Sequence, residues 1–363
     1  MIEVADIFRR FADGYLAAHG GAMPPSHKRA IADILACRSE TLGGHLWRCN
    51  RCGEDVYAYH SCRNRSCPKC HTDQAERWLK ARQSELLPCH YFHITVTVPQ
   101  DLRETLRSRQ KIAYPLFMKA AAQAIIELAR DPRHVGGDVG VLAVLHTWTQ
   151  QLIYHPHVHC QATGGGVSNG SWRPARQSFL FPYAALAKLV RGKLLAMLAK
   201  RCPELALPKA VWRKPWVVHC TPWGQGAEAV LRYLARYVFR AAISNSRIES
   251  LDNDGVTFRH QHRASNRWRR TRLPGHEFMR RFLQHVLPKG LHKVRYFGLW
   301  HPSKREEAAK ARLLLLLRPQ GADQAAQASK ADGQGAPPRL CQACGQGRLI
   351  HVRRLYPRQP EGP

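Results

Sequence analysis

Two pairs of cysteines, Cys49-x-x-Cys52 and Cys67-x-x-Cys70, place the strongest constraint on how this chain folds. Fourteen residues separate the pairs, which is close to the spacing at which two such turns supply four thiolates to one tetrahedral Zn²⁺ ion. Gly53 follows the first pair and suits a tight turn that aims backbone N–H groups at sulfur. The spacing therefore predicts a structural zinc site. Nearby residues that offer alternative ligands are Cys62, His45, His60 and His71.

The role of this predicted zinc site is open between two interpretations. Basic residues surround it, so it could contact phosphates, but a zinc ion that only staples the fold explains the pattern equally well. A set of reactive or merely buried thiols is less favoured, because five cysteines fall within 22 residues. A further pair, Cys341-x-x-Cys344, lies near the C-terminus. Two ligands do not complete a site, so its partners would have to come from elsewhere in the chain.

The charge of the chain indicates a polyanionic partner. Its 56 Lys and Arg residues against 26 Asp and Glu residues give a formal net charge of +30. Nucleic acid is the first candidate to balance such a charge, and an anionic membrane surface is the second. The longest apolar run, Leu313–Leu317, is far shorter than the ~20 residues that span a bilayer, and the first residues lack the apolar region of a signal peptide. We therefore expect a cytoplasmic protein without a membrane partner, whose cysteines are reduced or bound to metal.

Apolar periodicity predicts an α+β fold in which an antiparallel sheet is flanked by helices. We expect three regions: a helical and zinc-binding domain over 1–88, a catalytic domain over 89–302, and a tail over 303–363. The tail combines a basic helix, a flexible Ala/Gly/Gln-rich linker and the last cysteine pair. The predicted helices cover 1–45 with a break at Pro24-Pro25, 72–87, 103–129, 183–201, 227–243 and 303–317, and the predicted strands lie over 91–98 and within 139–163.

Histidines follow one another at every second position in the sequence YHPHVHC. Side chains alternate along a strand, so His155, His157 and His159 share one face while Val158 points into the core. His157 and His159 together suit a divalent cation. If the preceding strand pairs with this one through a loop over 150–153, His146 lies opposite His157 and completes a site with three imidazoles. The alternative is a cluster that binds phosphate or sits at a strand edge, which is common for a lone His-x-His.

A second informative segment, EAVLRYLARYVFR over 228–240, has the periodicity of a helix. Tyr233 and Tyr237 are one turn apart and share a face, and three arginines repeat along the adjacent face. Like charges at this spacing destabilise an isolated helix, so the row indicates a bound anion. The tyrosines could instead be ordinary amphipathic residues beside a core. The arginines that we predict to contact DNA in this segment are Arg232, Arg236 and Arg240.

A basic stretch over 259–281 holds eight arginines and one acid, with Trp268 and Phe278 interleaved. Arginines next to aromatic rings suit single-stranded nucleic acid, because the cations contact phosphates while bases stack on the rings. A solvated basic face explains the same stretch equally well. The arginines of this stretch that we predict to contact DNA are Arg267, Arg269 and Arg270.

Taken in order, these segments resemble the two-tyrosine transposases of the insertion-sequence-91 family, within the His-hydrophobe-His endonuclease superfamily. The resemblance covers most of the chain. The matching segments are VADIF, SCRNRSCPKC, YFHITVTVP, HPHVHC followed by GGG, YLARY, and RRFLQHVLPKGLHKVRYFGLW. Several motifs in the same order are far more specific than any one of them.

The resemblance implies a DNA transposase that cuts and rejoins single-stranded DNA during rolling-circle transposition, using Mg²⁺ or Mn²⁺. It implies that His157 and His159 bind the metal and that Tyr233 and Tyr237 form 5′-phosphotyrosine intermediates. For the third ligand we favour His146, with Gln150 or Glu228 as alternatives. We expect such a bacterial protein to associate with the nucleoid when it is bound to DNA. Two other functions compete: a rolling-circle plasmid replication initiator, and a non-catalytic zinc-containing regulator that binds DNA.

Overall fold

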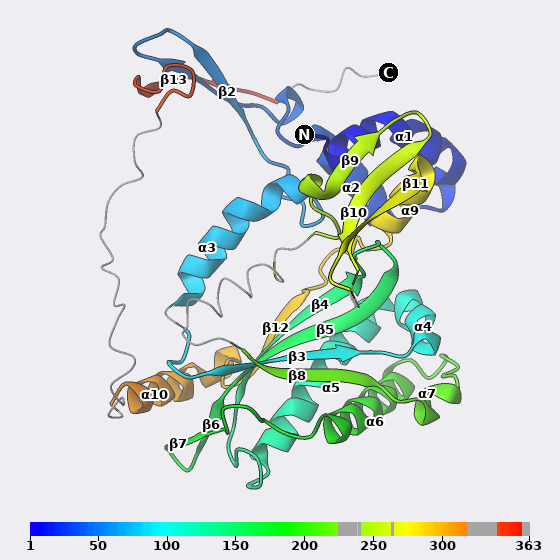
Figure 1. The fold of residues 1–363 in the computed structure, drawn as a ribbon, viewed down its shortest axis with the longest axis vertical. Helices are drawn as coiled ribbons and strands as arrows, with labels where there is room; N and C mark the ends of the chain where they lie inside the picture. Colours follow the sequence, from blue (N-terminus) through cyan, green and yellow to red (C-terminus); the bar gives the residue numbers. More distant parts are fainter. Residues whose placement is uncertain (84, 224–237, 239–240, 263–264, 318–339, 358–363) are drawn as a thin grey trace.

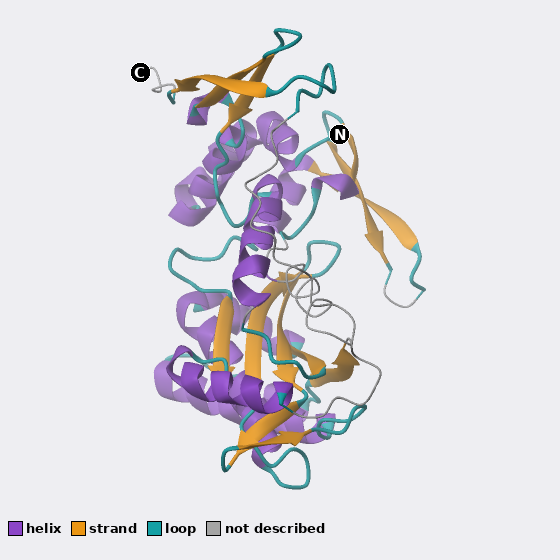
Figure 2. Ribbon diagram, turned by 90° about the vertical axis from the view of Figure 1, so that its left-hand side faces the viewer, coloured by secondary structure: helices purple, strands orange, loops and turns teal. Residues whose placement is uncertain are grey.

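The computed structural model describes residues 1–83, 85–223, 238, 241–262, 265–317 and 340–357. Figure 1 shows two lobes joined by helix α3 (His71–Gln83), with a small three-stranded sheet projecting beyond the upper lobe. Figure 2 shows the same stacking of the two lobes after a quarter turn. The mixture of helices with antiparallel sheets confirms the predicted α+β class.

The lower lobe is built on a five-stranded antiparallel sheet with the strand order β12-β4-β5-β3-β8. One face of this sheet packs against helices α5 and α6 through apolar residues such as Val158, Cys160 and Ala162, which alternate along β5 as predicted. The strands are β3 (Tyr91–Thr97), β4 (Gly140–Trp148), β5 (Tyr154–Thr163), β8 (Val217–Trp223) and β12 (Val294–Gly298). The helices are α4 (Arg103–Ser108), α5 (Gln110–Arg130), α6 (Tyr183–Arg201) and α7 (Ala210–Arg213), and a hairpin joins β6 (Gly165–Ser168) to β7 (Ser171–Pro174).

Helix α5 is long and apolar enough to cross a membrane by composition alone. Its apolar residues, among them Tyr114, Phe117 and Ile125, are buried in the core that it forms with the sheet and α6. The helix predicted over 103–129 is therefore a core element, and it is divided in two. Arg109 has non-helical backbone angles (φ −127°, ψ 42°) and separates α4 from α5.

The upper lobe combines two distant parts of the chain around one hydrophobic core. Phe8 packs edge-on against Phe282 with 5.3 Å between ring centroids. The predicted boundary at residue 88 therefore does not separate the two cores, because part of the region assigned to the catalytic domain completes the N-terminal one. The elements of the upper lobe are α1 (Val4–His19), α2 (Pro25–Ala36), β9 (Ile248–Leu251), β10 (Gly255–Gln261), β11 (Trp268–Pro274) and α9 (Gly275–Leu283).

The region predicted as a single C-terminal tail is also divided between two places. Helix α10 (Arg305–Leu316) buries Ala311 and Leu315 against the lower lobe. Strand β13 (Leu349–Leu355) instead pairs with β1 (Gly44–Cys49), which in turn pairs with β2 (Asp55–Tyr59). These three strands are called the ribbon sheet below.

The hairpin formed by β4 and β5 links the two lobes, because its tip inserts into the upper one. Leu152 at the tip is fully buried in the upper core, with a left-handed φ of +60°. Its carbonyl accepts hydrogen bonds from Gln284 Nε2 (2.8 Å) and His285 Nε2 (3.1 Å). Burial lowers the pKa of His285 to about 3, so the ring is neutral and its Nδ1 can accept from the hydroxyl of Thr147 at 3.1 Å. The upper lobe thus holds the end of the β4–β5 hairpin by burial of Leu152 and by these hydrogen bonds.

The shared core of the upper lobe leads to a test. Phe282→Ala removes a buried ring from that core and should cost about 3–5 kcal/mol of stability. Cys67 and Cys70 belong to the same core, so the variant should release zinc at a lower urea concentration than the unaltered protein. Phe117→Ala, an equally large truncation in the lower core, is the matched control and should leave zinc retention unchanged. Equal effects of the two variants on zinc release would contradict two separate cores.

Candidate functional site

Histidines from three adjacent strands gather on the face of the lower sheet that α5 and α6 do not cover. His146 on β4 lies opposite His157 on β5, the register that the sequence predicted. His159 lies two residues further along β5, so it shares the face of His157. Donor nitrogens of these three rings all lie within 4.8 Å of one another, and the ring centroids are 4.7 to 5.6 Å apart. The three rings can therefore coordinate a single metal ion.

Hydrogen bonds orient two of these rings for coordination. His157 Nδ1 lies 2.7 Å from the carbonyl oxygen of His155, to which an Nδ1–H donates, and this leaves a lone pair on Nε2. His159 Nδ1 lies 3.0 Å from His93 Nε2 and 3.2 Å from Thr95 Oγ1. Burial lowers the pKa of His93 to about 4, so this ring is neutral and can accept the proton of His159. Such outer partners fix the tautomer of a metal-binding histidine.

The histidine face forms the floor of an open groove of about 760 Å³. The opposite wall is the end of the β10–β11 hairpin in the upper lobe, which contributes His260, Gln261, His262 and Asn266. The groove therefore lies between the two lobes and has one wall from each. Because the groove is open rather than enclosed, an extended ligand can enter it.

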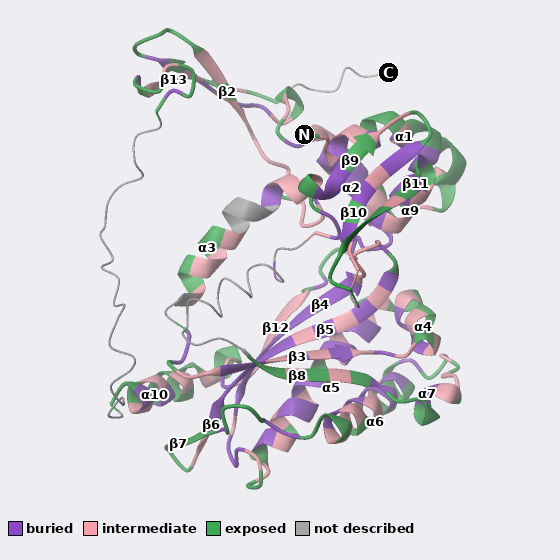
Figure 3. Cartoon of the chain, viewed as in Figure 1, coloured by how far each residue is buried: buried purple, intermediate pink, exposed green. Residues whose placement is uncertain are grey.

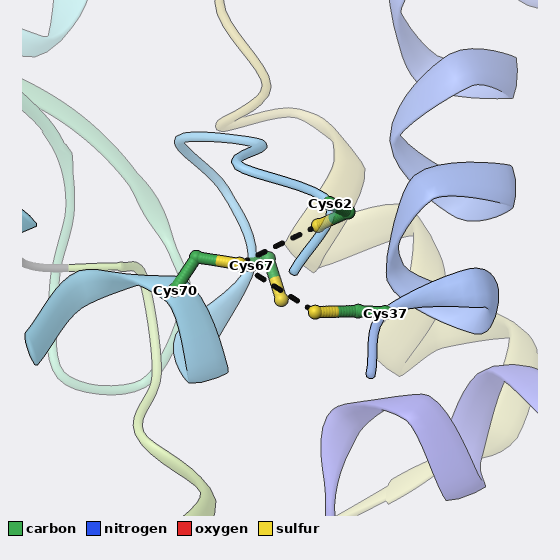
Figure 4. A group of neighbouring side chains, drawn as sticks. All are labelled: Cys37, Cys62, Cys67 and Cys70. Carbon is green, nitrogen blue, oxygen red and sulfur yellow. Dashed lines mark hydrogen bonds between the residues drawn. The ribbon is translucent and has the colours of Figure 1, made fainter. Parts of the chain in front are cut away.

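A cluster of four cysteines lies at the base of the upper lobe (Figure 4). Cys70 Sγ is 3.5 Å from Cys37 Sγ and 3.6 Å from Cys62 Sγ, and Cys67 completes the group. A disulfide needs about 2.05 Å between sulfurs. A tetrahedral zinc ion with Zn–S bonds of about 2.3 Å separates its thiolates by roughly 3.8 Å. The observed distances therefore fit zinc ligands rather than disulfides.

Comparisons with known proteins identify the family of this chain. Residues 7–98 match a family described as "Transposase zinc-binding domain", and residues 140–308 match one described as "Putative transposase". "Putative transposase y4qJ" of Sinorhizobium fredii is 36% identical over 377 residues, which cover 96% of this chain and 94% of that protein. The chain belongs to the insertion-sequence-91 family of transposases.

"Transposase for insertion sequence element IS801" of Pseudomonas savastanoi pv. phaseolicola is a more distant relative of this transposase. It is 28% identical over 301 residues, which cover 77% of this chain and 71% of that protein. No solved structure matches the chain significantly.

The prediction that a single zinc ion binds Cys49, Cys52, Cys67 and Cys70 is wrong in its grouping. The structure pairs Cys67 and Cys70 with Cys37 and Cys62, whereas Cys49 and Cys52 lie beside Cys341 and Cys344. Sequence reasoning missed Cys37 because it is a lone cysteine at the end of α2, without a partner at knuckle spacing. Only the packing of α2 brings it to the cluster.

Hydrogen bonds among the four thiols of the cluster around Cys70 lower the pKa of two of them and raise the pKa of Cys62 and Cys67. Hydrogen bonds from Cys37, Cys62 and Cys67 lower the pKa of Cys70, and a hydrogen bond from Cys62 is the main reason that the pKa of Cys37 falls to about 7. Asn64 N–H points at Cys62 Sγ over 3.4 Å. Thiolates are the zinc-binding form, and a backbone N–H aimed at sulfur stabilises a thiolate.

Basic residues beside this cluster serve the fold of the transposase. Arg65 donates to the backbone carbonyls of Leu287, Pro288 and Leu291 at 2.5 to 2.8 Å, and so fastens the zinc-binding loop to the segment before β12. Lys69 forms an ion pair with Glu3 at 2.5 Å. Of the two interpretations of the zinc site, these contacts favour a structural staple.

The arginines predicted to bind DNA are described only in part. Arg267 precedes β11, and Arg269 and Arg270 lie on it, all three exposed, with Arg270 paired to Glu249 at 2.7 Å. Trp268 is 57% exposed. The Cζ atom of Arg259 lies over its ring, 5.1 Å from the ring centroid. Phe278, in contrast, is fully buried, so it is a core residue and not a stacking platform. The remaining predicted residues, Tyr233, Tyr237, Arg232, Arg236, Arg240 and Glu228, lie outside the described residues.

Gln150, the alternative third metal ligand, lines the groove at the tip of the hairpin. Its side-chain oxygen accepts the backbone N–H of Gln261 at 2.8 Å. This contact ties Gln150 to the upper lobe, whereas His146 shares its donor cluster with His157 and His159. The geometry therefore favours His146 over Gln150.

The hydrogen bond between His93 and His159 leads to a second test. His93→Ala should weaken the affinity of the protein for Mn²⁺ by about 10–100-fold, because it removes the partner that orients His159. His159→Ala should weaken it further. His219→Ala, which alters another histidine that lines the groove, is the control and should leave the affinity unchanged. Mn²⁺ titration followed by electron paramagnetic resonance measures all three. Equal affinities for His93→Ala and His219→Ala would contradict this role of His93.

Proposed function

We propose that this transposase cuts and rejoins single-stranded DNA through 5′-phosphotyrosine intermediates. In this proposal Tyr233 and Tyr237 are the nucleophiles, and a Mg²⁺ or Mn²⁺ ion is held by His146, His157 and His159. The observation that carries the proposal is the cluster of three imidazoles on the floor of a groove open to an extended ligand. Imidazole nitrogens can bind a divalent cation, and water or phosphate oxygens, which Mg²⁺ and Mn²⁺ prefer, would complete its coordination.

The reaction exchanges one phosphodiester bond for another, with tyrosine in place of the 3′ oxygen, so it needs no external energy source. The tyrosine oxygen attacks phosphorus and gives up its proton. The bond from phosphorus to the 3′ oxygen breaks, and this oxygen takes up a proton and leaves as a 3′-hydroxyl. Rejoining reverses these steps, because a 3′-hydroxyl attacks the phosphotyrosine and releases the tyrosine. A bound divalent ion would offset the charge that develops on the phosphoryl oxygens. Two tyrosines allow two successive cleavages before the first product is released.

The described residue that is nearest in sequence to the proposed nucleophiles packs on the face of the sheet that carries the histidines. Val238, which directly follows Tyr237, is 3% exposed and packs in a cluster with Leu142 and Val144. These two residues alternate along β4 on the same face as His146. Val238 therefore lies on the histidine face of the sheet, and it directly follows Tyr237 in the sequence.

The groove also supports a single strand as the substrate. The end of the β10–β11 hairpin lines the groove, and the exposed Trp268 and Arg259 lie side by side elsewhere on this hairpin, with Arg267 and Arg269 adjacent to Trp268 in sequence. Bases of an unpaired strand can stack on such a ring while arginines contact phosphates. We propose that these arginines, together with Arg270, Arg232, Arg236 and Arg240, bind the DNA. As a transposase, the protein would act on DNA in the cytoplasm and associate with the nucleoid.

Covalent capture of DNA is the decisive test of this chemistry. Purified protein is mixed with 5′- and 3′-labelled single-stranded DNA from the ends of the element, with and without Mg²⁺, and run on denaturing gels. We expect a metal-dependent adduct that carries the label on the 3′ side of the cut, together with a free 3′-hydroxyl. His157→Ala should abolish it, and so should Tyr233→Phe combined with Tyr237→Phe.

Tyr296→Phe, a change at a partly buried tyrosine of β12, is the control and should preserve the adduct. An adduct that persists without both Tyr233 and Tyr237 would rule out the assignment of the nucleophiles. Tight binding that never yields an adduct on any end sequence would instead favour a non-catalytic DNA-binding protein.

The proposed arginine contacts can be tested through the salt dependence of binding. Arg267→Ala combined with Arg269→Ala should make the slope of log K against log salt less steep by about 0.7 for each phosphate that the variant no longer neutralises. Arg272→Ala is a suitable control, because the guanidinium of this β11 residue is already paired with the carboxylate of Asp252 at 2.7 Å. Fluorescence anisotropy of a labelled oligonucleotide gives the slopes. If the slope of the double variant matched that of the unaltered protein, these arginines would not contact the backbone.

A further inference from the structure

The two ends of the chain meet in a second cluster of four cysteines, which neither matched family region contains in full. Cys49 and Cys52 come from the β1–β2 turn, and Cys341 and Cys344 precede β13. The distance from Cys49 Sγ to Cys344 Sγ is 3.7 Å, and that from Cys52 Sγ to Cys341 Sγ is also 3.7 Å. Both distances are too long for disulfides and close to the roughly 3.8 Å between thiolates on tetrahedral zinc.

The two cysteine pairs have the same local geometry. Each is followed by a glycine in the left-handed region, Gly53 at φ +75° and Gly345 at φ +67°. Each of these glycines donates its N–H to the carbonyl of the first cysteine of its pair, at 3.1 and 2.9 Å. In each pair a backbone N–H also points at a thiol sulfur, from Arg51 to Cys49 (3.4 Å) and from Gly347 to Cys344 (3.3 Å). Each end of the chain thus contributes one zinc knuckle.

The knuckles are fitted closely to one another. A Cβ atom at Gly347 would lie 2.2 Å from Cys49 Sγ, so only glycine allows the second knuckle to approach the first. Asn50 holds them together, because its N–H donates to the Arg348 carbonyl at 3.1 Å and its side-chain oxygen accepts the Arg348 N–H at 2.9 Å.

We propose that Cys49, Cys52, Cys341 and Cys344 bind a second zinc ion, which fastens the C-terminal strand β13 to the N-terminal part of the chain. The ligands are thiolates, and four of them around a closed site are typical of structural zinc. The ribbon sheet is then a zinc ribbon assembled from both ends of the protein.

The ribbon sheet needs such a staple because it has almost no apolar core. No residue of β2 or β13 is buried, as Figure 3 illustrates, and Ile350 and Tyr57 are 56% and 53% exposed. Within the described part of the chain, the hydrophobic clusters include no residue of the ribbon sheet. The buried side chains of the ribbon sheet and its knuckles are Leu46 at 5% exposure and two of the proposed ligands, Cys49 at 2% and Cys341 at 1%. Metal coordination replaces apolar burial in small domains of this kind.

Zinc content and retention of the tail test this proposal together. A protease site is introduced within residues 318–339 of the full-length chain, the purified protein is cut there, and the products are separated by size exclusion. The unaltered sequence should hold two zinc ions per chain and keep the cut tail bound. Cys341→Ser combined with Cys344→Ser should hold one zinc ion and release the tail. The zinc ion that remains reports that the site around Cys70 has folded.

Two controls separate metal binding from other effects of the substitutions. Cys202→Ser combined with Cys220→Ser, outside both clusters, should retain two zinc ions and the tail. Cys344→His alone keeps Cys341 and supplies a different zinc ligand at position 344. Compared with the double serine variant, it should recover the second zinc ion and tail binding at least in part. The proposal is overturned if the unaltered protein holds a single zinc ion, if the Cys341/Cys344 serine variant still holds two, or if its tail stays bound after cleavage.

Discussion

Antiparallel pairing between β4 and β5 decides which side chains of this transposase meet in the groove. The register places His146 opposite His157, and a slip by one residue would turn one set of histidines into the core. The tip of this hairpin is held by the upper lobe through Leu152. The histidine cluster is therefore supported at one end by a second hydrophobic core, and the groove has a wall from each lobe. Substitutions that destabilise the upper lobe should therefore disturb the histidine cluster through the contacts of Leu152.

The upper lobe in turn depends on thiolates as well as on apolar burial. Cys37, Cys67 and Cys70 are buried in the same core as Phe8 and Phe282, so zinc and the aromatic rings stabilise the same unit. Arg65 extends this support to the segment before β12, a strand of the histidine-bearing sheet. A zinc-binding domain that supports the histidine-bearing sheet gives a structural reason for the presence of both in one chain. It needs no direct contact between zinc and DNA.

Sequence reasoning succeeded where a single element carries the information. The period-two pattern of YHPHVHC set the shared face of the histidines, and the length of the loop indicated that His146 lies opposite His157. Helix α6 and strand β3 appeared near their predicted bounds for the same reason. The prediction failed where ligands or core residues come from distant segments. Phe278 looked like an exposed aromatic among arginines, and only the packing of α9 against α1 shows that it is buried.

By itself, the sequence determined the α+β class, the need for zinc, the histidine face and the resemblance to a transposase family, because these follow from local spacing and from motifs in order. Only the tertiary structure decided which thiols share a metal, that Cys37 joins one cluster, and that β13 returns to β1. The physical reason is that the spacing of a knuckle specifies two ligands of a tetrahedral ion. The other two are chosen by the path of the chain, which brings together residues as far apart as Cys49 and Cys344.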